Sequence, residues 1–176
     1  MKSYNLKTER FLLKEIEQDD ITYIYQGLSH PEVIKYYGVS FHSLEDTRMQ
    51  MEWYADLRKN HTGIWFGIYS LETLEFCGAG GFNNLEKQHH KAEIGFWLLP
   101  EFWKKGIMNE VMPELMTFGF EHLNLNRIEA FVESENLSCK KAIEKCNFIL
   151  EGRMRECEVK NGKYIDVDTY AALKPK

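Results

Sequence analysis

A short basic loop is the stretch of this sequence whose residues are most able to do chemistry. Residues 103–106, with the sequence WKKG, follow a strand-like run and precede an apolar-striped segment that begins at Ile107. Apolar residues at i, i+1, i+4 and i+5 predict an amphipathic helix over 106–122. The first turn of a helix carries free N–H groups and the positive end of the helix dipole. The loop is therefore a candidate anion site.

Gly106 and two lysines support this interpretation. Glycine lets the main chain approach a phosphate closely, and Lys104 or Lys105 adds positive charge. The alternative is an ordinary loop glycine beside two solvated lysines, because one glycine is far short of a P-loop or a GxGxxG fingerprint. Pro113 lies inside the predicted helix, where a proline removes one i→i−4 hydrogen bond and costs about 3 kcal/mol or forces a kink.

Cysteine and histidine residues do not indicate a metal site. His89 and His90 stand without a nearby pattern of carboxylates or cysteines and are typical of a polar turn. The cysteines show neither a CxxC pair nor metal-ligand spacing, and we expect separate reduced thiols at Cys77, Cys139, Cys146 and Cys157.

The elements that must position the loop alternate between strands and helices. Hydrophobic periodicity and turn signals predict strands over 10–16 and 127–133, three strands within 64–100, and a final hairpin over 148–173. Capping residues and helical spacing predict a helix opened by Asp19 and Asp20, a second that restarts at Pro31, and two more over 43–60 and 136–145. Asn161 and Gly162 are a strong hairpin-turn signal. We expect an α/β domain with a mixed sheet, in which the loop begins a right-handed crossover to strand 127–133.

Composition limits the class of protein. The chain has 176 residues, 44% hydrophobic and 14% aromatic, so we expect one domain with one substantial core. Charges of both signs are interspersed to a net −5, which gives no indication of nucleic acid binding. No 18-residue apolar run indicates a membrane span. The N-terminal stretch lacks the apolar core of a signal peptide, so we expect a cytoplasmic protein.

Three segments in order resemble the GNAT family of acyl-CoA-dependent N-acetyltransferases: AEIGFWLLPEFWKKGIMNEVM, RIEAFVESENLSCKKAIEKCNFILEG and NGKYIDVDTYAAL. TERFLLKEIEQDD and HPEVIKYYG match the opening of the branch that includes the ribosomal-protein N-terminal acetyltransferases. The resemblance runs from about Thr8 to Leu173. It implies a single GNAT domain over 1–176, with a mixed and mostly antiparallel sheet of about seven strands flanked by helices. Acetyl-CoA is the implied co-substrate, without a metal, and family habit implies a homodimer.

The resemblance also assigns residues to coenzyme A. The pyrophosphate cradle maps onto Trp103, Lys104, Lys105, Gly106, Ile107 and Met108, with Asn109 in the same turn. Two positions depart from the pattern: Lys104 replaces a common glycine, and Met108 replaces a small residue that would not crowd the phosphates. The strand 93–99 would pair with the pantetheine arm through Phe96, Trp97 and Leu98, and a main-chain N–H near Trp97 or Leu98 would polarise the thioester. Asn136 is expected to cap its helix and contact the coenzyme, and Lys141, like Lys140, is a candidate for the 3′-phosphate against the alternative of a solvated lysine.

The proton-transfer residues are also implied by the resemblance. Acetyl transfer to an amine needs a neutral amine, a polarised carbonyl, a stabilised oxyanion and a protonated leaving thiolate. Counting along the segment places the family's base at Glu158 and its hydroxyl at Cys139. The alternatives are a solvated strand carboxylate at Glu158 and a space-filling thiol at Cys139. Ser138 is rotated about 100° around the helix. Ile143 replaces a tyrosine of the polyamine-acetylating branch, which argues against that branch.

The acceptor stays open at this stage. The expected pocket lies between the N-terminal helices and the loop near 81–90, with Tyr36, Tyr37, Trp53 and Tyr54 as candidate lining residues and core packing as the alternative. We expect a primary amine, in the first place a protein N-terminal amine; the rivals are a small-molecule amine such as an antibiotic, an amino acid or a polyamine. Met108, Cys139 and Pro113 depart from the family pattern. They favour the alternative class of function, a module that binds acyl-CoA without catalysing transfer.

Overall fold

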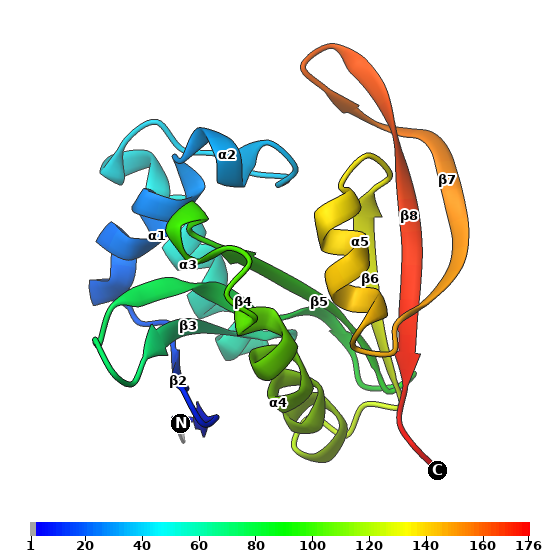
Figure 1. Ribbon diagram of the computed structural model, residues 1–176, viewed down its shortest axis with the longest axis horizontal. Helices are drawn as coiled ribbons and strands as arrows, with labels where there is room; N and C mark the ends of the chain where they lie inside the picture. Colours follow the sequence, from blue (N-terminus) through cyan, green and yellow to red (C-terminus); the bar gives the residue numbers. More distant parts are fainter. Residues whose placement is uncertain (1–2) are drawn as a thin grey trace.

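A computed structural model describes residues 3–176, and one mixed sheet of eight strands runs through them (Figure 1). The strand order is β1-β2-β3-β4-β5-β6-β8-β7, and every neighbouring pair is antiparallel except β5 with β6. The strands are β1 (Asn5–Lys7), β2 (Phe11–Glu15), β3 (Ile64–Ser70), β4 (Phe76–Glu86), β5 (Lys91–Leu98), β6 (Arg127–Glu133), β7 (Ile149–Lys160) and β8 (Lys163–Leu173). The mostly antiparallel mixed sheet is confirmed. The eighth strand, β1, has three residues, too few to show a periodic pattern.

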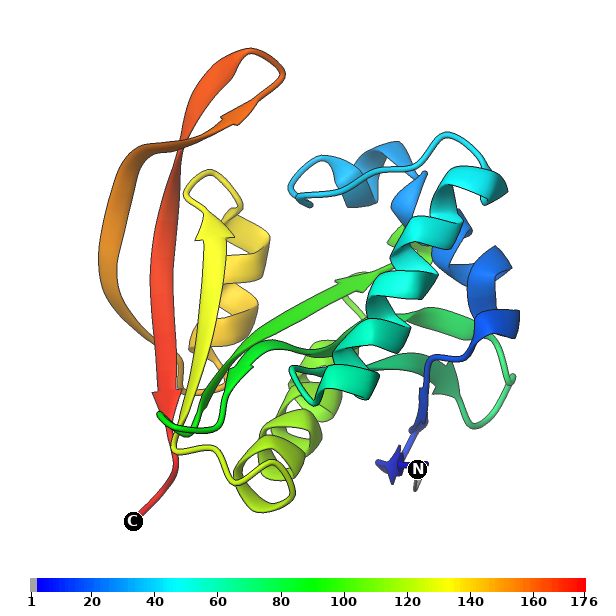
Figure 2. The same ribbon diagram turned by 180° about the vertical axis from the view of Figure 1, so that it is seen from behind.

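Helices cover both faces of this sheet. The α-helices are α1 (Ile21–Leu28), α2 (Pro31–Ile34), α3 (Leu44–Asn60), α4 (Ile107–Glu121) and α5 (Leu137–Glu144), with 3-10 turns η1 (Gln18–Asp20) and η2 (Pro100–Phe102). Helices α4 and α5 lie on one face, and α1 to α3 lie on the other (Figures 1 and 2). Each face has its own buried cluster, and β5 contributes to both by alternation: Ile94 packs on the α4 side, whereas Trp97 packs on the side of α1 to α3.

Local signals in the sequence account for several element ends. Ser43 Oγ accepts the Asp46 N–H at 3.1 Å at the start of α3. Asn161 and Gly162 both have positive φ, 51° and 74°, as a tight hairpin turn between β7 and β8 requires. The tip of this hairpin reaches across to α2, since Lys160 Nζ donates to the Lys35 carbonyl at 2.7 Å.

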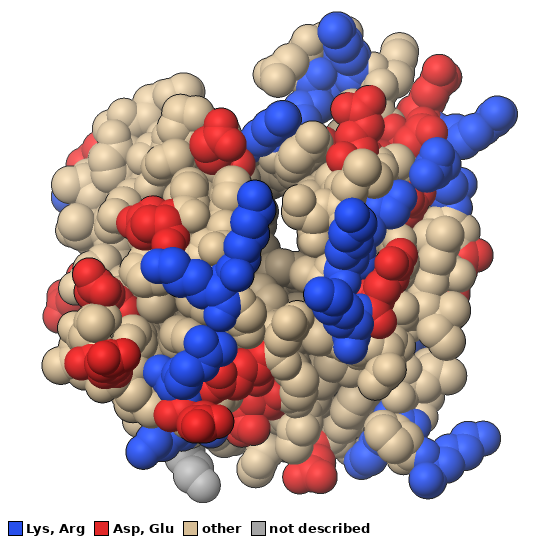
Figure 3. Space-filling model, viewed as in Figure 1, with Lys and Arg blue, Asp and Glu red and all other residues tan. Residues whose placement is uncertain are grey.

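The strands β5 and β6 part soon after they meet. Their parallel ladder covers only Lys91–Glu93 against Arg127–Glu129. Beyond it, β5 stays paired with β4 as far as Leu98, while β6 stays paired with β8 as far as Glu133. The two halves of the sheet therefore diverge (Figure 1), and the space-filling view shows an opening through the molecule between them (Figure 3).

Candidate active site

The loop before α4 lies beside this divergence and has the backbone of an anion cradle. Lys104 and Gly106 have left-handed φ values of 60° and 72°, which explains why glycine suits both positions. Gly106 is the N-cap and offers no side chain, and the N–H groups of the next three residues have no intrahelical acceptor. A Cβ on Gly106 would meet only Arg10 Nη2, at 3.8 Å. The main chain is thus open to a ligand, as a diphosphate requires.

The two irregular residues of this segment do not disturb it. Met108 is 8% exposed and packs in the core under α4. Its bulk is directed into the core, so the expectation that it crowds the phosphates is wrong. Pro113 is exposed, and α4 continues through it to Glu121. Trp103 ties the loop to β5, because its indole Nε1 donates to the Leu98 carbonyl at 2.8 Å.

The free edge of β5 is the second part of the site. The Arg127 N–H donates to the His90 carbonyl at 3.1 Å, so by alternation the even-numbered residues of β5 direct their main-chain groups toward β6. Phe96 and Leu98 lie beyond the ladder and therefore present their N–H groups to the cleft. Trp97 faces β4 with its main chain and is 4% exposed in the core, so of the two N–H groups expected to polarise the thioester only that of Leu98 faces the cleft, and its role stays a prediction.

The helix α5 borders the other side of the cleft. Asn136 Oδ1 accepts the Cys139 N–H at 3.1 Å, which confirms the expected cap. Cys139 is half-buried, and burial raises the pKa of its thiol to about 12. Lys141 is exposed, but Lys140 turns away and pairs with Asp168 at 2.5 Å. Lysine and arginine side chains border the opening over the loop and over α5 (Figure 3), although the net charge of the chain is −5.

Glu158 lies on the exposed outer part of β7. No hydrogen bond or ion pair joins its side chain to any residue within 3–176. This position fits the alternative of a solvated strand carboxylate, and a role as the base stays a prediction from the resemblance.

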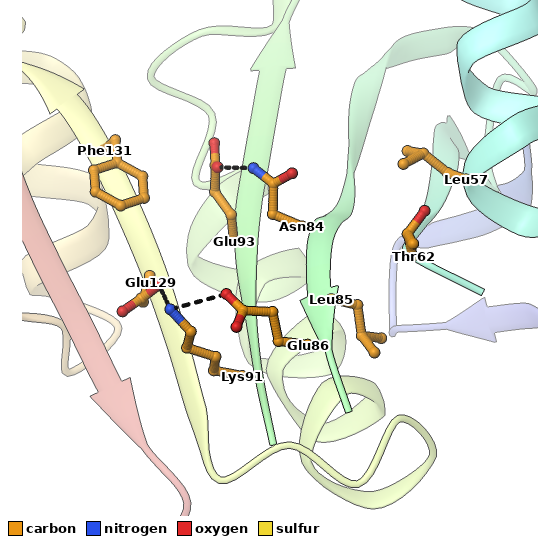
Figure 4. A pocket seen from close by; sticks show the side chains of 9 residues that line it. All are labelled: Leu57, Thr62, Asn84, Leu85, Glu86, Lys91, Glu93, Glu129 and Phe131. Atoms are coloured by element: carbon orange, nitrogen blue, oxygen red, sulfur yellow. Dashed lines mark hydrogen bonds and ion pairs between the residues drawn. The ribbon is translucent and has the colours of Figure 1, made fainter. Parts of the chain in front are cut away.

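The acceptor pocket between the N-terminal helices and the loop near 81–90 stays a prediction, and the structure shows a hollow beside that region. A hollow of about 580 Å³ lies between the end of α3 and strands β4, β5 and β6 (Figure 4). None of the four predicted aromatic residues lines it. Tyr54 is 4% exposed and packs in the α1 to α3 core, Tyr37 packs against that core, and Tyr36 lies under the Lys35 ammonium, 5.1 Å from its ring centre. Trp53 is 38% exposed, and its ring centre lies 6.1 Å from that of the buried Trp65. Carboxylates line the hollow instead, with Glu93 on β5 among them.

Asp168 is a functional candidate that the sequence analysis missed. It is fully buried on β8, and it accepts from Ser134 Oγ at 2.7 Å, Arg153 Nε at 2.6 Å and Lys140 Nζ at 2.5 Å. The hydrogen bond from Arg153, then those from Lys140 and Ser134, hold the pKa of Asp168 well below its usual range against the effect of burial. This network fixes α5 to β7 and β8.

The described residues contain neither a candidate metal site nor a candidate membrane-spanning helix. Within residues 3–176, no group of three or more His, Cys, Asp or Glu side chains is placed to hold a metal ion. No helix in the same range is both long and apolar enough to cross a membrane.

Comparison with known proteins defines the class. Residues 10–149 match the model of the acetyltransferase (GNAT) domain, and the chain belongs to this family. It is 34% identical over 172 residues to the uncharacterized N-acetyltransferase YoaA of Bacillus subtilis, covering 97% of each chain. The chain is accordingly an acetyl-CoA-dependent N-acetyltransferase.

Two solved structures share the fold. One is RimL, a ribosomal L7/L12 alpha-N-protein acetyltransferase in complex with coenzyme A, at TM-score 0.88 and 23% identity over 97% of this chain and 98% of that one. The other is spermidine N-acetyltransferase from Vibrio cholerae in complex with coenzyme A and spermine, at TM-score 0.83 and 22% identity over 93% and 95%.

Proposed function

We propose that the chain transfers acetyl directly to a protein N-terminal amine while both substrates are bound. The main support for this proposal is the divergence of β5 from β6, because it leaves an unpaired strand edge beside the N-terminus of α4. Figure 3 shows an opening through the molecule, and the helices α4 and α5 lie on one face of the sheet and α3 on the other (Figures 1 and 2), so we expect the coenzyme and the amine to approach from opposite faces. The likeness to RimL, whose name gives a protein alpha-amine as its substrate, supports the choice of acceptor. Four free cysteines, one of them exposed, support the cytoplasm as its location.

Different residues of the cleft would bind the diphosphate, polarise the thioester carbonyl and donate a hydrogen bond to the leaving sulfur. Acetyl-CoA supplies the acetyl thioester. The main-chain N–H groups of Gly106 and the first turn of α4 hold the diphosphate, and Lys141 adds charge near the entrance. Leu98 donates its N–H toward the thioester carbonyl, where negative charge grows during attack. Cys139 keeps its proton at neutral pH, because burial raises its thiol pKa to about 12. It is therefore suited to donate a hydrogen bond to the leaving sulfur.

A pair of glycine variants tests the coenzyme site. Gly106 and Gly162 have nearly equal φ values, 72° and 74°, and neither has a close neighbour. Alanine at either position strains the backbone by about 1–2 kcal/mol. Only Gly106→Ala should weaken coenzyme A binding, on the order of tenfold by calorimetry, because only there must the strained conformation be kept for the ligand. Equal affinities for the two variants would remove the loop from the site.

Thiol release from acetyl-CoA measures the reaction itself. Peptides with free N-termini, the same peptides blocked at the N-terminus, spermidine and free amino acids form the panel. Free peptides should raise thiol release above hydrolysis, and blocked peptides should not. Tight coenzyme A binding with no turnover for any amine would contradict the transfer reaction and select the non-catalytic binding module.

A further inference from the structure

The turn between β1 and β2 packs against the first turn of α4, next to the loop 103–106. Glu110 lies in that helical turn and accepts three hydrogen bonds from the β1–β2 turn. They come from Thr8 Oγ1 at 2.6 Å, from the main-chain N–H of Arg10 at 2.8 Å and from Arg10 Nε at 2.6 Å. The N-terminal part of the chain is thus attached to the coenzyme side of the molecule.

The pair of Arg10 and Glu110 adds no net charge beside the loop. Burial acts to raise the pKa of Glu110, but the hydrogen bonds from Thr8 and Arg10 together hold this pKa below its ordinary value. The carboxylate is therefore ionised at neutral pH and cancels the charge of the guanidinium. Because the pair offers an anion no net attraction, its effect on the loop must come from its geometry.

A further hydrogen bond connects Arg10 with the loop itself. Arg10 Nη1 donates to the Lys105 carbonyl at 3.3 Å. That carbonyl and the N–H of Gly106 belong to one planar trans peptide group, in which C=O and N–H point in opposite directions. Holding the carbonyl toward Arg10 therefore turns the Gly106 N–H away from Arg10. Lys104, a non-glycine residue with a left-handed φ of 60°, strains this loop, so the conformation needs support from outside.

Arg10 is itself held firmly enough to give that support. Its carbonyl accepts the Leu71 N–H at 2.8 Å, and its guanidinium carbon lies 5.0 Å from the ring centre of Phe11, which is buried in the core. The planar guanidinium donates to Glu110 and to the Lys105 carbonyl from different nitrogens. A lysine ammonium is a single point charge and lacks this fixed fork.

We propose that Arg10 is a positioning residue for coenzyme A, which holds the Lys105 carbonyl and thereby directs the Gly106 N–H to the diphosphate. Thr8 and Glu110 keep the guanidinium in place. The inference rests on the proposed function for the place of the diphosphate. It adds to the coenzyme site a residue that precedes Lys105 by 95 positions in the sequence.

Calorimetry with coenzyme A and with 3′-dephospho-coenzyme A tests this role without turnover. Arg10→Gln should weaken the binding of both ligands about 10-fold, because both carry the diphosphate. Arg10→Lys keeps the charge but loses the fork, and it should lose nearly as much affinity. The stoichiometry of each titration gives the folded fraction of the variant. Arg48→Gln, which breaks an exposed ion pair with Glu45 on α3, is the control and should bind like wild type.

Glu110→Gln tests the sign of the effect and keeps the inference testable if Arg10→Gln does not fold. If charge alone mattered, removal of a carboxylate from the first turn of α4 would strengthen anion binding. Since Glu110 holds Arg10, we expect binding of coenzyme A to be weaker by about 3- to 10-fold. Tighter binding by Glu110→Gln would overturn the inference. So would wild-type affinity for Arg10→Lys, or a loss with Arg10→Gln that is confined to the ligand with the 3′-phosphate.

The glycine variants separate this inference from the proposed function. Wild-type affinity for Arg10→Gln together with weakened binding by Gly106→Ala would contradict the role of Arg10 alone. Equal affinities of Gly106→Ala and Gly162→Ala would instead contradict the place of the diphosphate. Coenzyme A binding that depends on Arg10 without any acetyl transfer would uphold the positioning role and contradict the transfer reaction.

Discussion

The buried carboxylate of Asp168 gives the sharpest prediction for the scaffold of the site. Replacing Asp168 by Asn removes its charge but keeps its shape. Lys140 Nζ and Arg153 Nε, now at 2.5 and 2.6 Å from carboxylate oxygens, would then face an amide that is neutral. Breaking a buried ion pair costs 3–5 kcal/mol in other proteins. The side chain of Arg153 is 49% exposed and recovers hydration, which reduces its share. We expect a loss of about 3 kcal/mol in the free energy of unfolding.

Urea unfolding at several pH values measures this loss. Because the partners lower the folded-state pKa of Asp168, its stabilisation is present above the unfolded pKa, about 3.9, and is lost as pH falls toward the folded value. The difference between wild type and Asp168→Asn should therefore stay constant from pH 7 to about pH 5 and narrow below about pH 4. At pH 7 the melting temperature should fall by about 6–12 °C.

Asp166→Asn is the control for this experiment. Asp166 lies two residues away on β8, is half-buried and accepts one main-chain N–H, from Glu156 at 2.8 Å. An amide oxygen can keep that bond, so we expect a change below about 1 kcal/mol. If Asp168→Asn were no more destabilising than Asp166→Asn, the buried network would not hold α5 in place.

Two further variants examine the cleft and the helix beside it. Cys139→Ala should lower kcat by about tenfold if the thiol donates to the leaving sulfur, and Cys139→Ser should restore most of the rate. Since the thiol pKa is about 12, no step of the wild-type pH profile between pH 6 and 10 should belong to Cys139. A kcat of the Ala variant within twofold of wild type would leave Cys139 a space-filling residue. Pro113→Ala restores one helical hydrogen bond and removes the clash of the proline ring at an exposed position, together about 3 kcal/mol, against about 1 kcal/mol of lost rigidity in the unfolded chain. Urea unfolding should show a gain of about 2 kcal/mol, and a loss of stability would show that α4 needs the proline.

Features with local causes were predictable from the sequence. The helical stripe that begins at Ile107, the Asn136 cap and the hairpin turn at Gly162 depend on residues a few positions apart, and the structure confirms each of them. The strand order was not predicted in full, because β8 lies between β6 and β7 and no local pattern in the sequence indicates that insertion.

Features that depend on distant partners were not predictable in the same way. Asp168 meets partners from β7, from α5 and from the turn before α5, and nothing in the stretch YIDVDTY separates it from Asp166. Glu93 did leave a signal that the sequence analysis did not use. Along one face of β5 the residues change from Lys91 and Glu93 to Trp97. That change from charged to apolar side chains marks where the cover of α1 to α3 ends and an exposed hollow begins.

The cleft itself follows from the different attachments of β5 and β6. Trp97 packs against α1 at Gly27, where a Cβ would lie 2.0 Å from its ring, and the ring of Trp65 crosses β5 at Gly95, where a Cβ would lie 2.8 Å away. These contacts hold β5 to the core of α1 to α3 from the second residue after the ladder ends. Strand β6 is paired with β8 along its whole length, through seven residue pairs from Arg127 to Glu133. Neither strand can follow the other, so the edge between them stays unpaired and available to a ligand. A larger residue at Gly95 would displace Trp65 and with it β5, so the cleft requires a glycine at this position.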